Sequence, residues 1–236
     1  MRHAYGCART YGAVLLVLAV TLSGCAAPVV PTDIDLVTTV GGRAAKPALP
    51  PRPMPPDPMA LGSKDAVLTI VEFSDYQCSY CQRFHVEVLP ALKKAYIDTG
   101  KVQLIFKDYP LTSHREAMPA AIAGRCAAAQ GKFWPMNELL FANQGRLEGA
   151  LYARLAQKLA LDLEAFKLCT QDAGLRAAVE RDQKQARDLG IDATPGFLIG
   201  RMQGEHMLVE RVGKGFVDFA ALSVELDKLL AVPAPK

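Results

Sequence analysis

Two cysteines with two residues between them, Cys78 and Cys81, stand where a predicted strand gives way to a predicted helix. The predicted strand covers residues 66–73 and is dominated by large apolar side chains, many of them β-branched. After the cysteines, apolar residues recur at the spacing of one helix face, at Phe84, Val88, Leu92, Ala95 and Tyr96. This pattern places the first cysteine at the N-terminus of the helix.

The N-terminus of a helix favours a negative charge, because its first N–H groups lack partners and the helix dipole is positive there. We therefore expect the pKa of Cys78 to lie below its ordinary value, and the thiolate is the reactive form of cysteine. Cys81, one turn further on, is expected to lie deeper and to close a disulfide with Cys78. A C-x-x-C pair between a strand and a helix thus predicts a dithiol/disulfide redox centre.

The N-terminal part of the chain has the pattern of a secretory signal. Residues 1–24 combine a weakly basic start with an apolar run at 13–22, about half of the roughly 20 residues that a membrane-spanning helix needs. Leu22-Ser23-Gly24-Cys25 resembles the lipobox of bacterial lipoproteins. That resemblance implies cleavage before Cys25 and a lipid on its sulfur, and Ala26 is implied to permit transfer to an outer membrane. The alternatives are an ordinary secretory cleavage with a free cysteine nearby, or a signal anchor that stays.

Residues 25–60 are predicted to be a linker, because prolines crowd the second half of this segment. Such a stretch buries no core and tends toward extended polyproline conformation. We expect it to hold the following domain away from a membrane surface, and a proline-rich ligand for a partner is the alternative. The net charge of +3 comes with no basic run, so nothing indicates nucleic-acid binding.

The predicted domain spans residues 61–231, with a tail at 232–236. The helix after the cysteines is expected to kink at Pro90 and to end at Thr99-Gly100. The remaining predicted elements are a strand at 102–106, a helical block at about 113–189, strands at 197–199 and 207–212, and a closing helix at 216–230.

Glu72 lies within the first predicted strand, and the period-2 alternation puts it on the opposite face from Val71 and Phe73. One interpretation is a solvated strand glutamate. The other is a partly buried carboxylate that takes and returns the proton of Cys81 during exchange.

Cys126 and Cys169 remain once the N-terminal cysteines and the C-x-x-C pair are set aside. In an oxidising compartment, two leftover cysteines suggest a structural disulfide. Closing a loop of roughly 44 residues contributes about 4 kcal/mol in the chain-entropy model. Two separate buried thiols are the alternative.

The order of strand, C-x-x-C, helix, strand, helical insertion, Thr-Pro, strand pair and helix resembles the thioredoxin fold of the DsbA-like family. The similarity covers about residues 61–231 and is most specific in Phe73 to His85 and in Ala193-Thr194-Pro195-Gly196-Phe197. Residues 107–111 and 126–134 also look like that family's insertion. The resemblance implies an α/β fold, in which helices flank a central mixed sheet, with an inserted all-helical subdomain.

The resemblance also implies residue roles. Cys78 matches the exposed nucleophile that forms a mixed disulfide, and Cys81 matches the buried resolving thiol. Pro195 matches a cis-proline beside the disulfide, with Thr194 offering backbone hydrogen bonds to an extended substrate peptide. Glu72 matches a buried acid beneath the dithiol.

The same resemblance gives expectations for two further residue pairs. Cys126 and Cys169 match a second cysteine pair of a subset of relatives. Ser79 and Tyr80 are expected to contact substrate, and they depart from the Pro-His of strongly oxidising members. Because tyrosine supplies no positive charge, the Cys78 thiolate should be less stabilised than in those members, and the bridge a weaker oxidant.

The leading hypothesis is a lipid-anchored thiol–disulfide oxidoreductase on the periplasmic side of the cell envelope, which introduces disulfides into exported proteins. We expect a monomer with no metal and no cofactor besides its Cys78–Cys81 bridge. A quinone-linked DsbB-like or VKOR-like membrane protein is the implied redox partner.

Three alternatives remain. The first is a reductase or isomerase fed with electrons by a membrane donor, although isomerases of this fold usually dimerise through an N-terminal domain that the proline-rich residues 26–60 do not resemble. The second is a non-catalytic lipoprotein that uses the fold for binding. The third is a zinc module using Cys78, Cys81 and His85, for which a second ligand cluster is missing. His85, His114 and His206 receive no role in the reaction.

Overall fold

The computed structural model describes residues 57–232. The predicted signal peptide, Cys25 and most of the predicted linker lie outside the described residues. Within residues 57–232, no helix has the length and apolar character that crossing a bilayer requires.

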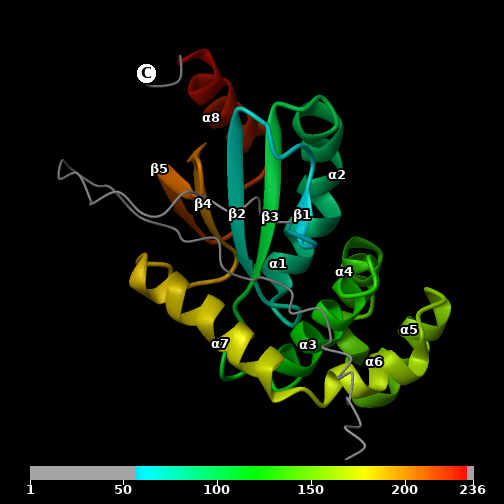
Figure 1. The fold of residues 1–236 in the computed structure, drawn as a ribbon. Helices are drawn as coiled ribbons and strands as arrows, with labels where there is room; N and C mark the ends of the chain where they lie inside the picture. Colours follow the sequence, from blue (N-terminus) through cyan, green and yellow to red (C-terminus); the bar gives the residue numbers. More distant parts are fainter. Residues whose placement is uncertain (1–56, 233–236) are drawn as a thin grey trace, which may run out of the picture.

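The described strands form one mixed sheet in the order β1-β3-β2-β4-β5 (Figure 1). The two central strands, β2 and β3, are parallel, and every other neighbouring pair is antiparallel. The strands are β1 Ala60–Leu61, β2 Leu68–Ser74, β3 Val102–Asp108, β4 Gly196–Gln203 and β5 His206–Lys214. This sheet confirms the predicted α/β class and thioredoxin fold.

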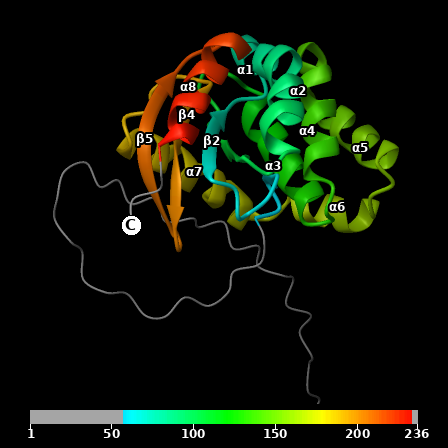
Figure 2. The same cartoon turned by 90° about the horizontal axis from the view of Figure 1, so that it is seen from above.

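Helices cover both faces of the sheet and form a group at one end of it (Figures 1 and 2). α2 and α8 lie on one face and α7 on the other, whereas α3 to α6 gather below the sheet in Figure 1. The helices are α1 Ser79–Arg83, η1 Phe84–Val88, α2 Leu89–Leu92, η2 Lys93–Ile97, α3 Ala117–Ala128, α4 Phe133–Ala142, η3 Gln144–Arg146, α5 Gly149–Lys158, α6 Leu163–Thr170, α7 Ala173–Asp188 and α8 Phe219–Ala231.

The alternation of β2 divides the core into two layers. Leu68 and Ile70 pack with the helices that follow the cysteines and with α8, whereas Val71 and Phe73 pack under α7. Glu72 shares the face of Leu68 and Ile70, and it is fully buried. The predicted opposition between Glu72 and its two apolar neighbours is therefore confirmed, and the carboxylate points toward the helix that carries Cys81.

The first helical segment is less regular than predicted. It runs from α1 into the π-helical turn η1, then through the short α2, which has Pro90 in its first turn, and into a second π-helical turn, η2. Pro90 lacks the N–H that would continue the α-helical ladder, which accounts for a change of hydrogen-bond pattern near it. Gly100 closes the segment with a φ of 74°, in the left-handed conformation that the sequence predicted.

Strand β1 was not predicted. Its residues pair with β3, Ala60 opposite Ile105, and the preceding Met59 is buried. The sequence analysis assigned residues up to 60 to the proline-rich linker, because a two-residue strand has no periodicity to detect.

A buried ion cluster joins the helical insertion to the sheet. Arg125 of α3 donates to Asp108 through Nε at 2.6 Å and also donates to Asp182 of α7. Lys107 of β3 lies 3.2 Å from Asp182. The acids of this cluster lie beside its two bases, so the cost of burying each charge is offset by its partners.

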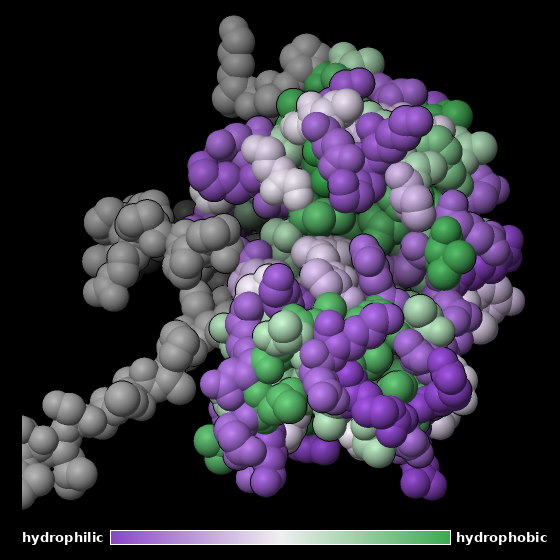
Figure 3. Space-filling model, turned by 90° about the vertical axis from the view of Figure 1, so that its right-hand side faces the viewer, coloured by the Kyte–Doolittle hydropathy of each residue, from purple (hydrophilic) through white to green (hydrophobic). Residues whose placement is uncertain are grey.

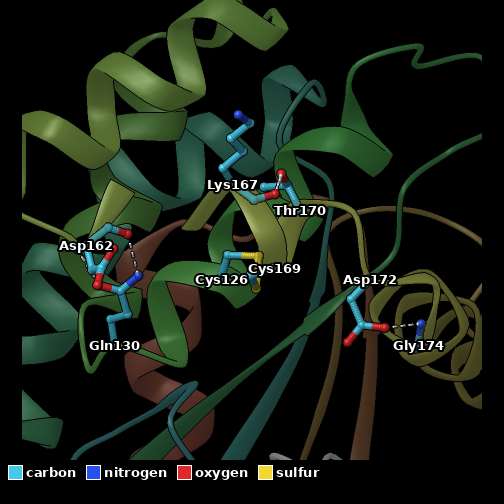
Figure 4. The surroundings of a disulfide bond; sticks show 8 residues. All are labelled: Cys126, Gln130, Asp162, Lys167, Cys169, Thr170, Asp172 and Gly174. Carbon is cyan, nitrogen blue, oxygen red and sulfur yellow. Dashed lines mark hydrogen bonds between the residues drawn. A yellow bond between two sulfur atoms is a disulfide. The ribbon is translucent and has the colours of Figure 1, made fainter. Parts of the chain in front are cut away.

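Cys126 of α3 and Cys169 of α6 form a disulfide within the insertion (Figure 4). Beside it, the Gln130 side chain donates to the Asp162 carbonyl and accepts from the Asp162 N–H. The bridge and this amide pair hold the end of α3 against the start and end of α6.

Replacing both Cys126 and Cys169 with alanine should lower the free energy of unfolding by about 4 kcal/mol, because the unfolded chain regains the entropy of an open loop. Guanidinium unfolding of the full-length protein measures the loss. The single variant Cys126→Ala should lose a similar amount, since one missing sulfur already opens the loop. A loss within experimental error of zero would contradict a stabilising bridge.

Candidate active site

The strand-to-helix turn after β2 places the two reactive sulfurs. Asp75 begins the turn, with its carboxylate accepting from the Gln77 N–H at 2.7 Å and its carbonyl accepting from the Cys78 N–H at 3.1 Å. Cys78 is the N-cap of α1, and its backbone is extended. The helix therefore starts directly after the first cysteine, as the sequence predicted.

The loop before β4 lies against Cys78. Phe73 at the end of β2 is opposite Gly196 at the start of β4, so the residues just before Gly196 reach the turn. The Cys78 sulfhydryl donates to the Thr194 carbonyl oxygen at 3.4 Å, and the Thr194–Pro195 peptide bond is cis, as the resemblance implied.

The surroundings of Cys78 favour its thiolate. The hydrogen bond from the Cys81 sulfhydryl, the largest effect, lowers the pKa of Cys78 to about 5. Burial opposes this shift, and Thr194 and the first N–H groups of α1 add to it. The Thr194 hydroxyl is buried and has no hydrogen-bond partner among the described residues. The predicted lowering is confirmed, although the helix N–H groups are a smaller cause than the second cysteine.

Cys81 has the opposite environment. Burial raises the pKa of the Cys81 thiol well above its ordinary value, and the neighbouring Cys78 and Glu72 raise it further. The Asp75 N–H donates to its sulfur at 3.5 Å. Cys81 is 0% exposed, as the resemblance implied. Cys78 is 8% exposed, so the expectation of an exposed nucleophile was wrong: this thiol is buried as well, although less deeply. The loop at Thr194 accounts for this limited exposure.

Glu72 is held by a histidine. Nε2 of His85 lies 3.1 Å from each carboxylate oxygen of Glu72, and both side chains are buried. His85 follows Cys81 by four residues on the same helical segment, which puts both on the side facing Glu72. His85 was considered only as a zinc ligand and received no role in the reaction, although this spacing was the signal that could have found it.

Two polar contacts from the helical insertion and its leading loop hold the turn, and neither was predicted. The Gln144 side-chain amide donates to the carbonyl oxygens of Tyr76 and Cys78, at 2.9 and 3.0 Å. His114 Nδ1 lies 2.8 Å from the Asp75 carboxylate. These partners are distant in the sequence, so no local pattern reveals them.

The remaining predicted site residues are on the surface or bonded elsewhere. Ser79 and Tyr80 begin α1 and are exposed, Tyr80 by 56%, beside the first cysteine. Cys126 of α3 and Cys169 of α6 form a bridge with each other. Residues 57–232 contain no group of three or more histidine, cysteine or acidic side chains placed to hold a metal ion.

Comparisons with known proteins agree with this geometry. Residues 55–214 match the model of a protein family described as thioredoxin. A probable disulfide bond formation protein D from Bacillus cereus is 33% identical over 149 residues, which are 59% of this chain and 68% of that protein. The crystal structure of alpha-DsbA1 from Wolbachia pipientis is similar with a TM-score of 0.66 and 28% identity, covering 75% of this chain and 92% of that chain.

A different relative is the Na(+)/H(+) antiporter NhaA 3 of Salinispora tropica. It is 34% identical over 139 residues, which are 58% of this chain and 21% of the antiporter. The chain therefore spans about a fifth of that relative's length.

The thiolate of Cys78 should form near pH 5 in the reduced protein. The absorbance of the thiolate near 240 nm, followed against pH, measures this, and Cys78→Ala should remove the step. The unfolded chain binds a proton at this cysteine up to its ordinary pKa, whereas the folded chain releases it near pH 5. The reduced protein should therefore become more stable as pH rises from about 5 toward 9. A single transition above pH 8 would contradict the assignment.

Proposed function

Because this chain belongs to the thioredoxin family and is a DsbA-like thiol–disulfide oxidoreductase, we propose that its Cys78–Cys81 bridge introduces disulfides into exported proteins of the cell envelope. The observation that carries the proposal is the unequal pair of thiols: the pKa of Cys78 is lowered to about 5 and that of Cys81 is raised. In a pair of this kind, an incoming thiolate attacks one specific sulfur when the bridge opens, and the thiol of the other cysteine closes the bridge again.

The exchange proceeds in two displacements. A substrate thiolate attacks the Cys78 sulfur, the Cys78–Cys81 bond breaks, and Cys81 leaves with the electron pair and takes up a proton. A second substrate thiolate then attacks its own partner sulfur in the mixed disulfide and releases Cys78 as a thiolate. Two electrons pass from two substrate thiols to the cysteine pair, so the substrate gains one disulfide and the protein is left reduced.

The low pKa of Cys78 supports the oxidising direction. A stable thiolate makes Cys78 a good leaving group and stabilises the reduced protein, which raises the reduction potential. A reductase needs the reverse preference. The missing histidine between the cysteines favours a milder oxidant than the strongest members of the family, as the sequence analysis predicted.

The substrate contacts follow from what surrounds Cys78. The Thr194 carbonyl contacts its sulfur, and the backbone of Thr194 and Pro195 is the proposed edge on which an extended peptide lies. The exposed Ser79 and Tyr80 adjoin the same sulfur and complete this surface. Glu72 is the proposed acid that exchanges a proton with Cys81, because it is buried and raises the pKa of that thiol.

The setting of the enzyme is part of the proposal. Cleavage after residue 24 and a lipid on Cys25 anchor the chain to a membrane, with residues 25–60 as the spacer. The domain acts as a monomer on the periplasmic side and carries no metal or other cofactor. A DsbB-like or VKOR-like membrane protein reoxidises the cysteine pair.

Substitution of either reactive cysteine should separate the two displacements. Cys78→Ser should abolish both insulin reduction and oxidative refolding of a reduced substrate, because the attacked sulfur is gone. Cys81→Ser should abolish turnover but retain Cys78, so that a mixed disulfide with substrate accumulates. Non-reducing gels and intact mass detect that species. An unchanged phenotype in cells that carry Cys78→Ser would favour a non-catalytic binding protein instead.

The reduction potential of the Cys78–Cys81 pair should lie between about −270 mV for thioredoxin and about −120 mV for DsbA. The reason is that a Cys78 pKa of about 5 falls between about 7 and about 3.5 for those proteins. Equilibration of the full-length protein with glutathione buffers, followed by thiol counting, gives the value. A potential at or below that of thioredoxin would make the protein a reductant with an electron-supplying partner.

A further inference from the structure

A cavity beside the redox centre has no part in the exchange as described above. It has a volume of about 460 Å³ and lies between the helical segment after Cys81 and α4. Figure 3 looks onto this side of the molecule and shows hydrophobic surface between the upper and lower halves of the view. The lining is mostly apolar, and its titratable side chains are His85, Lys93 and Glu138.

His85 joins this cavity to Glu72. Its Nε2 lies 3.1 Å from both carboxylate oxygens of Glu72, and its ring stacks on Phe141 with centroids 4.1 Å apart. Among the described residues, the second ring nitrogen, Nδ1, has no hydrogen-bond partner. His85 lines the cavity, and a cavity of this size holds several water molecules, so we infer water as the partner of Nδ1.

Glu72 has no other evident contact with water. Its side chain is 0% exposed, and both of its oxygens face His85. On its inner side Glu72 acts on Cys81, whose pKa it raises. Cys81 is also 0% exposed. A proton that reaches Cys81 must therefore pass buried groups. Glu72 acts on Cys81 electrostatically and contacts His85, and His85 lines the cavity.

The exchange requires such a route. Each opening of the bridge leaves a thiolate on Cys81, and its raised pKa means that it takes up a proton at neutral pH. Cys78 stays a thiolate and needs none. We expect a bound substrate to cover the surface around Cys78, whereas the cavity lies on the side of η1, α2 and α4.

We propose that His85 carries protons between water in this cavity and Glu72, and that Glu72 exchanges them with Cys81. In the opening step the substrate or reductant thiolate attacks Cys78, and the electron pair of the broken bond leaves on Cys81. The proton held by the Glu72–His85 pair moves to Cys81, and the pair regains a proton from water. Closing of the bridge runs each transfer backward. The inference rests on the proposed exchange chemistry.

The other titratable and aromatic groups near Glu72 and His85 do not connect Glu72 with the cavity. Tyr76 lies at the inner end, where Glu72 contributes to raising its pKa. Lys93 and Glu138 line the cavity at the outer end. Glu87 in η1 pairs with Arg83 at the exposed surface, and Phe106 of β3 presents only its ring to His85. Among these groups, His85 alone contacts both Glu72 and the cavity.

The test measures bridge opening by dithiothreitol and closing by oxidised glutathione in single turnovers, on the full-length protein. His85→Ala should slow both steps, on the order of 10-fold to 100-fold, because general acid–base assistance is lost. Added imidazole should restore the rates, since the truncated side chain leaves a ring-sized space open to the cavity. His206→Ala, a substitution on β5, is the matched control and should show neither effect.

A second variant guards against a folding defect. The His85→Gln side chain can still hydrogen-bond Glu72 but does not take up and release a proton. This variant should therefore fold and should slow opening and closing of the bridge by similar factors. Its reduction potential should then match that of the wild type, because a proton carrier changes rates and leaves the equilibrium unchanged. Far-UV circular dichroism and the unfolding midpoint verify the fold of each variant.

Three results would overturn the proposal. These are unchanged rates in both variants, slowing that imidazole does not relieve in folded His85→Ala, and a shift in potential that accounts for the slowing. Because dithiothreitol is not a protein substrate, the proton route can fail while oxidative folding activity stands. Failure of the wild type to oxidise any reduced protein would instead refute the proposed function.

Discussion

The geometry of the redox centre depends on strand β2, which is buried along its whole length and paired on both sides. Antiparallel pairing with β4 sets Phe73 opposite Gly196, so the turn that follows β2 must meet the loop that precedes β4. This constraint brings Cys78 against Thr194, 116 residues away. Because a shift of one residue would turn Glu72 toward α7, the same register also fixes the acid beneath the cysteines.

One helical turn separates two cysteines whose pKa values are shifted in opposite directions. Cys78 lies at the start of α1, where the Cys81 sulfhydryl, Thr194 and backbone N–H groups lower its pKa. Cys81 lies inside, where burial outweighs the hydrogen bonds it receives. Each cysteine amplifies the difference, because the proton on Cys81 stabilises the charge on Cys78, and that charge disfavours a second one. The pair therefore holds one proton over a wide range of pH.

The sequence predicted features that local patterns determine, and it missed those that depend on contacts between distant segments. The C-x-x-C turn and the order of strands and helices follow from periodicity and turn residues. The burial of Glu72 could not be predicted without knowing that η1 packs on β2. The contact between His85 and Glu72 could not be predicted without knowing of that burial. Gln144 was not predictable, because an amide in the short helix η3 carries no signal until the fold sets it beside the Cys78 carbonyl. Strand β1 was too short to show a period.

The helical insertion belongs to the site as much as the sheet does. It supplies Gln144 to the cysteine turn and Phe141 to the ring of His85. Its own position depends on the ion cluster that ties Arg125 and Asp182 to β3. Burial raises the pKa of Asp108 in this cluster to about 6, with Arg125 opposing, so the cluster depends on that guanidinium to keep the carboxylate charged. The contacts that dock the insertion on the sheet therefore also set the geometry around Cys78 and Glu72.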